Sequence, residues 1–221
     1  MSTSQLKAVQ EEVAHTIRND TAARHTGKYT NRNPIHRLTL GRFFARLAEV
    51  LKGVGGVDQE RSAVFEFGCG EGLLLRELKN RGFKCGELIG IDLRANALAQ
   101  ARDLHPEWRF ECVDLFKWSP PKPKFDVVIA SQVLEHIPNP RPILEKLVAM
   151  TGGTLVLTVP KEPWFQIMNL LRGRDLLRLG NHPEHVNRWS TAQFAKFVSE
   201  FATIERVESV FPFTIVVAKP K

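Results

Sequence analysis

Apolar residues recur along the chain in two alternating patterns. Short β-prone runs predict five buried strands, at residues 64–67, 88–91, 109–113, 125–130 and 154–159. Apolar positions at helical spacing predict helices over residues 34–54, 73–78, 95–104, 138–150 and 191–201. Strands that alternate with helices in this way form a parallel sheet, so the order predicts an α/β protein with helices on both faces of the sheet.

The end of the chain departs from this alternation. Two extended runs, 204–210 and 213–218, are separated only by Phe211 and Pro212. So short a link cannot hold a crossover helix, and the pair is therefore predicted to be an antiparallel hairpin. The expected fold is a Rossmann-like, doubly wound sheet of seven strands, mostly parallel, with a C-terminal antiparallel hairpin.

The chain of 221 residues suits one domain with its own core. We divide it into an N-terminal helical cover (1–35), a cofactor-binding core (36–160), an insertion placed as a substrate lid (161–189), and a final helix and hairpin (190–221). The polar N-terminus lacks the apolar run of a secretory signal, and no stretch approaches the roughly 20 apolar residues of a membrane span. A cytoplasmic location is therefore expected.

Cysteine content and charge narrow the chemistry only slightly. The three cysteines are odd in number and lie in predicted core elements, which favours reduced thiols over a disulfide framework. No Cys-x-x-Cys pair occurs, so no structural zinc or other metal site is expected. The net charge of +7 favours the approach of anionic partners such as nucleic acid, acidic metabolites or lipid head groups.

A glycine-rich turn follows the first predicted strand. Residues 66–72 read Glu-Phe-Gly-Cys-Gly-Glu-Gly. In a doubly wound sheet ligands bind at the carboxyl ends of the strands, and glycines there allow positive φ angles and close approach of the backbone to a ligand. A dinucleotide fingerprint would need its third glycine at position 73, which is Leu73. The spacing therefore disfavours an NAD-dependent enzyme.

Three further motifs follow in order. Asp92 ends the second strand, Asp114 follows the third, and the run from Phe125 to His136 begins with Phe-Asp and ends in Val-Leu-Glu-His. With the glycine turn, this set resembles the class I S-adenosylmethionine (SAM)-dependent methyltransferases, in particular small bacterial members of the type 11/23 kind. Each motif is weakly specific by itself, whereas the four in this order, across residues 64–160, are specific.

The resemblance implies where SAM would bind. Glu66 would lie near the positively charged end of SAM, Leu93 against the adenine, and Ser131 and Gln132 beside the methionine part. Asp92 can accept hydrogen bonds from both ribose hydroxyls, although an aspartate there also suits a helix N-cap. Asp114 would accept from the adenine amino group, or else be a solvated loop residue. The full expected cofactor set is Tyr29, Glu66, Phe67, Gly68, Cys69, Gly70, Gly72, Asp92, Leu93, Arg94, Asp114, Leu115, Ser131, Gln132 and Val133.

Tyr29 enters this set through residues 29–34, Tyr-Thr-Asn-Arg-Asn-Pro, which resemble a Tyr-x-x-x-Asn-Pro pattern that precedes the core of some small bacterial methyltransferases. The segment is expected to fold over the cofactor. Asp126, at the start of its strand, is expected to be structural because it lies far from the ligand edge.

The methyl acceptor is less well indicated. The Asn/Asp-Pro-Pro-Tyr/Phe motif of many nitrogen methyltransferases is absent at residues 131–134, which read Ser-Gln-Val-Leu. His136 is the candidate catalytic residue, because an imidazole that titrates near pH 6.5 can take a proton from a hydroxyl or phenol. The alternative is that His136 lines the pocket without proton transfer.

The insertion at 161–189 carries an apolar block followed by three arginines. This block could pack on the core, line an apolar substrate pocket, or contact a membrane interface. The expected substrate contacts are His136, Trp164, Met168 and His182. His182 and His185 with Glu184 could bind a metal, but a polar turn is preferred.

These patterns together predict an enzyme that moves a methyl group from SAM to a small-molecule hydroxyl or phenol, possibly apolar or lipid-like, with S-adenosylhomocysteine (SAH) as the product. An RNA methyltransferase is the alternative that the charge favours, although no RNA-binding appendage is recognisable. A non-catalytic SAM-binding regulator is the other alternative. The sequence indicates neither the acceptor's identity nor the oligomeric state.

Overall fold

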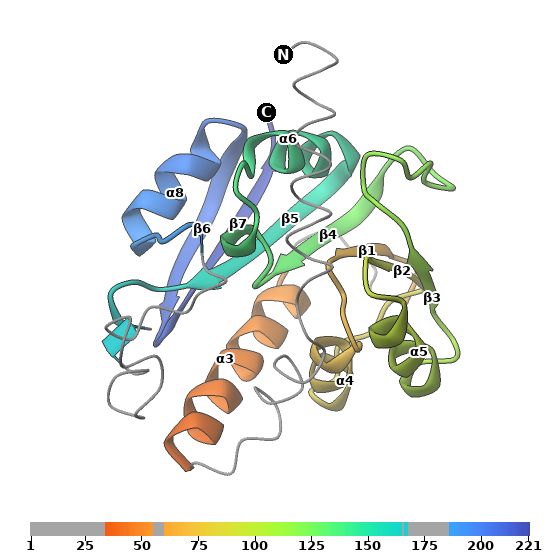
Figure 1. Cartoon of the computed structure of the whole chain (residues 1–221), viewed down its shortest axis with the longest axis horizontal. Helices are drawn as coiled ribbons and strands as arrows, with labels where there is room; N and C mark the ends of the chain where they lie inside the picture. Colours follow the sequence, from red (N-terminus) through yellow and green to blue (C-terminus); the bar gives the residue numbers. More distant parts are fainter. Residues whose placement is uncertain (1–33, 55–59, 165, 168–185) are drawn as a thin grey trace.

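The computed structural model describes residues 34–54, 60–164, 166–167 and 186–221 (Figure 1). Within them, seven strands form one sheet in the order β3-β2-β1-β4-β5-β7-β6. The strands are β1 (Ala63–Phe67), β2 (Glu87–Asp92), β3 (Arg109–Cys112), β4 (Phe125–Ser131), β5 (Thr151–Pro160), β6 (Ala202–Val210) and β7 (Phe213–Pro220). Strands β1 to β5 pair in parallel, and β7 is antiparallel to both of its neighbours. The predicted fold class, including the C-terminal hairpin, is confirmed.

Helices cover both faces of the sheet, as Figure 1 shows. One face packs against α6 (Arg141–Met150) and α8 (Thr191–Ser199), and the other against α3 (Pro34–Lys52), α4 (Leu73–Asn80) and α5 (Ala95–Leu104). All five residues of β1 are buried because helices lie on both of its sides. None of the described helices is both long enough and apolar enough to cross a membrane.

Two element boundaries differ from the sequence prediction by three residues. Helix α6 begins at Arg141 rather than at 138, because Pro140 disfavours the helical conformation at Asn139 before it. Strand β5 begins at Thr151, three residues earlier than predicted, and its first residues include Gly152 and Gly153. Glycines weaken a strand pattern in sequence, which explains why this start was missed. The short 3-10 turn η1 (Leu134–His136) was not predicted.

The strand order positions the site. The chain builds β1, β2 and β3 outward in one direction and then returns to place β4 on the other side of β1. In a doubly wound sheet, ligands bind at the carboxyl edge where the strand order reverses in this way, here between β1 and β4. The glycine turn and residues 131–136 are the segments that follow β1 and β4 at this edge.

Asp126 lies at the start of β4, away from that edge. Its Oδ2 accepts a hydrogen bond from the backbone N–H of Ala63 at 2.8 Å. We predict that Asp126→Ala lowers the free energy of unfolding by about 1 kcal/mol, because a charge-assisted hydrogen bond to the backbone is lost at a partly exposed site. Urea denaturation measures this loss. Asp126→Asn keeps an acceptor oxygen and is the matched control; equal stability of Asp126→Ala and the wild type would contradict a structural role.

Candidate functional site

The glycine turn after β1 has the backbone conformation that its sequence predicts. Gly68, Gly70 and Gly72 have φ angles of 72°, 54° and 70°, a region that residues with a Cβ rarely adopt. A Cβ added to Gly68 would lie 2.5 Å from Cγ2 of Val133. The turn after β4 therefore packs directly on the turn after β1, and glycine is needed at the contact.

Asp92 joins β2 to this turn. The carboxylate is 8% exposed, and its Oδ2 accepts a hydrogen bond from the backbone N–H of Gly70 at 2.9 Å. Its Oδ1 accepts from the backbone N–H of Arg94 at 2.9 Å. The N-cap of α5 is Arg94 itself, so Asp92 is not a helix cap. The structure thus brings Asp92 and the glycine turn together at the carboxyl edge.

Arg94 lies over the same turn and pairs with two carboxylates. Its Nε is 3.2 Å from Oδ1 of Asp92, and one terminal nitrogen is 3.5 Å from Oε1 of Glu71. A Cβ on Gly70 would lie 2.9 Å from the other terminal nitrogen. Glu71 is 5% exposed and was not assigned to the site from sequence. The sequence signal that could have identified Glu71 is its position as an acidic residue between two glycines of the turn.

Glu66 is a buried carboxyl beside this cluster. It is 2% exposed, and within the described residues its Oε2 has no hydrogen-bond partner. Burial, with a smaller effect from the charge of Asp92, raises the pKa of Glu66 to about 8. A positive charge brought close to Glu66 would favour its ionised form, so the site is suited to a cationic ligand group.

The turn after β4 is held by β5. Gln132 has a φ of 59°, and it is the one non-glycine residue with a positive φ in the described part of the chain. Its side-chain Nε2 donates to Oγ1 of Thr158 at 3.2 Å, and Ser131 Oγ lies 2.8 Å from the same oxygen. Thr158 was not singled out from sequence, because within a buried β-prone run it is read as a strand residue.

His136 is the last residue of the 3-10 turn η1, which begins directly after Val133. Its side chain is 13% exposed, and its Nε2 lies 3.8 Å from Oε1 of the buried Glu135. The carbonyl of Glu135 accepts hydrogen bonds from the backbone N–H groups of Val186 and Asn187, both at 3.0 Å. The returning end of the 161–189 insertion is thus attached to the turn that carries His136.

The two ends of the insertion are hydrogen-bonded to each other. The backbone N–H of Glu162 donates to the carbonyl of Trp189 at 3.0 Å, so the segment leaves and re-enters the fold at one place beside β5. Trp164 is 45% exposed and contacts the exposed ring of Phe211 edge-on at 5.9 Å between centroids. Ile167 is 37% exposed. These described residues of the apolar block do not pack in the core.

The remaining predicted cofactor residues are placed less decisively. The Asp114 Oδ1 accepts from the backbone N–H of Phe116 at 2.8 Å, and Leu93 is half-buried. The side chains of Phe67, Cys69 and Leu115 are buried in the core, so a ligand could meet only their backbone. Their roles stay predictions. Tyr29, Met168 and His182 lie outside the described residues, as do Glu184 and His185.

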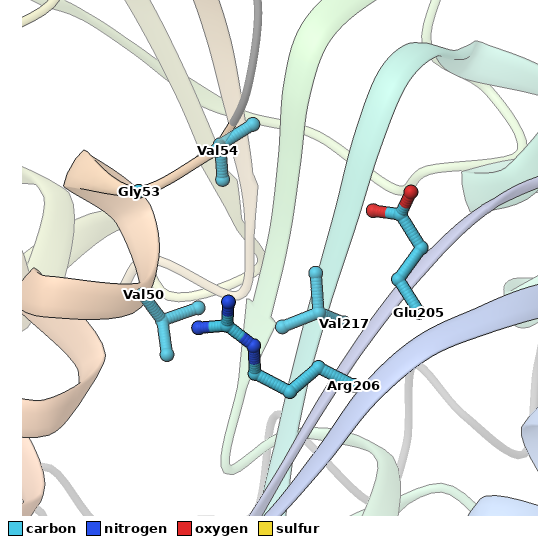
Figure 2. Close-up of a pocket in the computed structure, with 6 residues that line it drawn as sticks. All are labelled: Val50, Gly53, Val54, Glu205, Arg206 and Val217. Carbon is cyan, nitrogen blue, oxygen red and sulfur yellow. The ribbon is translucent and has the colours of Figure 1, made fainter.

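A separate cavity of about 240 Å³ lies between the C-terminal end of α3 and strands β6 and β7. Figure 2 shows Arg206 extending between Val50 of α3 and Val217 of β7. None of its lining residues belongs to the glycine turn or to the turn after β4. This cavity is therefore distinct from the predicted cofactor site.

Comparison with known families gives a match over most of the chain. The profile of a family described as "Methyltransferase domain" matches residues 37–201. A trans-aconitate 2-methyltransferase of Sinorhizobium medicae is 33% identical over 140 residues, 62% of this chain and 47% of that protein. A ubiquinone biosynthesis O-methyltransferase of Alkalilimnicola ehrlichii is 28% identical over 163 residues, 66% of this chain and 64% of that protein. The chain thus spans about half to two thirds of the length of these relatives.

Solved structures share the fold at low sequence identity. The plantazolicin methyltransferase BpumL, in complex with SAH, superposes with a TM-score of 0.67 at 14% identity and covers 99% of this chain and 98% of its own. The magnesium protoporphyrin IX methyltransferase of Synechocystis PCC 6803, with bound SAH, gives a TM-score of 0.64 at 17% identity over 90% of this chain and 93% of its own. At these identities the likeness establishes the fold alone.

The buried Glu66 generates a prediction about stability and pH. Its pKa is higher in the folded protein than the ordinary 4.5, so folding retains a proton that the unfolded chain releases. This contribution to stability is present at low pH and is lost as the pH rises toward 8. We expect Glu66→Gln to remove a fall of about 1.4 kcal/mol per pH unit in the free energy of unfolding between about pH 5 and about pH 8.

Urea denaturation of both proteins at several pH values measures the two slopes. Glutamine keeps the shape of the side chain but cannot titrate, so it isolates the proton. Parallel slopes for the wild type and Glu66→Gln would show that Glu66 does not hold this proton.

Proposed function

Because the chain belongs to the methyltransferase domain family, we propose that it transfers a methyl group from SAM to a small-molecule hydroxyl or phenol and releases SAH. Membership of the family confirms the predicted class of enzyme and its methyl donor at the level of the family. The observation that carries the proposal for this chain is the buried Asp92 carboxylate bonded to the glycine turn. Family membership gives the methyl donor but not the acceptor, which rests on His136 and the surroundings of the insertion.

The residues present fit SAM. The turn at Gly68 and Gly70 leaves no space for a Cβ, because Val133 and Arg94 pack against it, and Asp92 has two acceptor oxygens that suit a ribose diol. Glu66 adds a buried carboxyl whose Oε2 is unpartnered among the described residues and which suits a cationic group. SAM, when bound, supplies a sulfonium-activated methyl carbon whose bond to sulfur breaks with the electron pair left on sulfur.

Arg94 gives cofactor binding an additional step. Its guanidinium contacts Oδ1 of Asp92 at 3.2 Å and Oδ2 at 3.4 Å. Each oxygen of Asp92 already accepts from one backbone N–H and from the Arg94 side chain, so Arg94 must release both oxygens for both to accept from ribose hydroxyls. The nearby Glu71 carboxylate, already 3.5 Å from Arg94, can keep the guanidinium charge paired during this exchange.

His136 is the residue proposed to handle the acceptor's proton. As the acceptor oxygen bonds to the methyl carbon, His136 takes the hydroxyl proton and thereby carries a positive charge. The Glu135 side chain, 3.8 Å from its Nε2, favours that charged form when it is ionised. The His136 side chain is 13% exposed, with its Nε2 buried.

The surroundings of the insertion favour an apolar or aromatic acceptor. Trp164, Ile167 and Phe211 expose apolar surface where the segment 161–189 leaves the fold. The relative named as a ubiquinone biosynthesis O-methyltransferase supports transfer to oxygen. The relatives named as trans-aconitate 2-methyltransferases make a small polycarboxylate the second candidate, which the net charge of +7 also favours.

Cofactor binding tests the site. We predict that Asp92→Ala weakens SAM binding by about 1–3 kcal/mol, because charge-assisted hydrogen bonds to the ligand are lost. Titration calorimetry with SAM and SAH measures the change. Asp126→Ala removes an aspartate at the opposite edge of the sheet and is the control, with affinity expected to be unchanged. Wild-type affinity in Asp92→Ala would place the ribose elsewhere.

Acceptor chemistry is tested by SAH release with three probes: a catechol-type phenol, a tricarboxylate, and a short RNA. We expect release with the phenol, and His136→Gln to lower kcat by about 100-fold or more while SAM affinity stays the same, because a general base is lost. An unchanged kcat would assign His136 to lining the pocket. Release only with the RNA, steeply dependent on salt, would favour the RNA alternative, and tight SAM binding without release would favour a regulator.

A further inference from the structure

We propose that Thr158 is a positioning residue, which holds the turn of residues 131–133 in the conformation that cofactor binding requires. This rests on the proposed function in taking that turn to lie beside the methionine part of SAM. Thr158 lies near the carboxyl end of β5, in register with Ser131 at the end of β4. It is fully buried, so its hydroxyl acts on its neighbours and not on solvent.

Thr158 contacts the turn through both its backbone and its side chain. Its carbonyl accepts from the backbone N–H of Gln132 at 2.9 Å, and its Oγ1 accepts from the side-chain Nε2 of Gln132 at 3.2 Å. The same Oγ1 lies 2.8 Å from Oγ of Ser131. One threonine thus fixes the backbone of Gln132, the side chain of Gln132 and the hydroxyl of Ser131.

The backbone of Gln132 needs such a restraint. Its φ of 59° is a left-handed conformation, which is unfavourable for a residue with a Cβ. Conformations of this kind persist where the surrounding contacts over-determine them. The two bonds from Gln132 to Thr158 supply that restraint across the β4–β5 pair.

The hydrogen bonds of the Thr158 hydroxyl link two side chains of the turn. The Gln132 Nε2 can only donate, so the Thr158 hydroxyl accepts from it. Either hydroxyl of the Thr158–Ser131 pair can be the donor in the bond between them. Thr158 therefore ties the position of the Ser131 hydroxyl to that of the Gln132 side chain.

A displacement of Gln132 would reach the glycine turn. The next residue, Val133, packs on Gly68 so closely that an added Cβ there would lie 2.5 Å from Cγ2 of Val133. The turn after β4 and the turn after β1 therefore cannot move independently. Thr158, which touches only the first of them through the bonds described, can influence both.

Two substitutions isolate the hydroxyl. Thr158→Val keeps the shape and removes the hydroxyl, whereas Thr158→Ser keeps the hydroxyl and removes a methyl group. We expect Thr158→Val to weaken SAH binding about fivefold to tenfold in calorimetry, the size of one lost hydrogen bond, and Thr158→Ser to stay within about twofold of the wild type. In turnover, KM for SAM should rise by a similar factor for Thr158→Val only.

Thr214→Val is the matched control. Thr214 is also fully buried, and its hydroxyl lies 2.8 Å from that of Thr191. It pairs with Val159 of β5, the next residue along from Thr158, and so faces the other side of the sheet. Thr214→Val should lose stability to a similar degree without a change in SAH affinity. Equal losses of affinity in Thr158→Val and Thr214→Val would overturn the proposal and leave a merely structural role.

The outcomes separate this proposal from the proposed function. If the wild type binds neither SAM nor SAH, the proposed function fails. If the wild type binds SAH and Thr158→Val binds it equally well, only the role of Thr158 fails. Should Thr158→Val not fold, Thr158→Ala and Thr214→Ala form the replacement pair, judged by the same difference in affinity.

Discussion

The hydrogen bond from the Gly70 backbone to the Asp92 carboxylate is the contact on which the site depends. It joins the loop after β1 to the end of β2 at 2.9 Å, inside a protein environment where Asp92 is 8% exposed. A buried charge is tolerated only when it is well hydrogen-bonded, so the turn must present its N–H groups, and this is possible because Gly70 adopts a φ of 54°. This one bond therefore depends on the strand order of the sheet, on the glycine at position 70 and on the charge of Asp92.

The cost of this arrangement is a concentration of carboxyl groups. Glu66, Glu71 and Asp92 are all buried at the glycine turn, and Arg94 pairs with two of them. Glu66 has no such bond on its Oε2 within the described residues, and burial raises its pKa to about 8. A fold selected for stability alone would not keep this cluster. Its negative potential instead suits a ligand that carries positive charge.

The sequence predicted the features that depend on local pattern. The glycine turn, Asp92 at a strand end and the C-terminal hairpin each follow from neighbouring residues, and the structure places them as expected. The sequence could not predict the hydrogen bonds between Gln132 and Thr158, because residues 26 apart meet only once β4 and β5 are paired in register. The ion pair of Arg94 with Glu71 was missed for the same reason. The start of α6 was a local error, since Pro140 was read as part of the helix.

In the proposed function, acceptor choice and cofactor binding fall to different segments. The cofactor side is built from strand ends that the sheet fixes. Among the described residues, the insertion is bonded to the fold through Glu162 and Trp189 and through the bonds of Val186 and Asn187 to Glu135. Relatives of 28–33% identity carry different names, ubiquinone biosynthesis O-methyltransferase and trans-aconitate 2-methyltransferase. What they share with this chain therefore cannot specify the acceptor. Under the proposed function, the insertion at 161–189, whose described end is bonded to the turn of His136, is the segment proposed to select the acceptor.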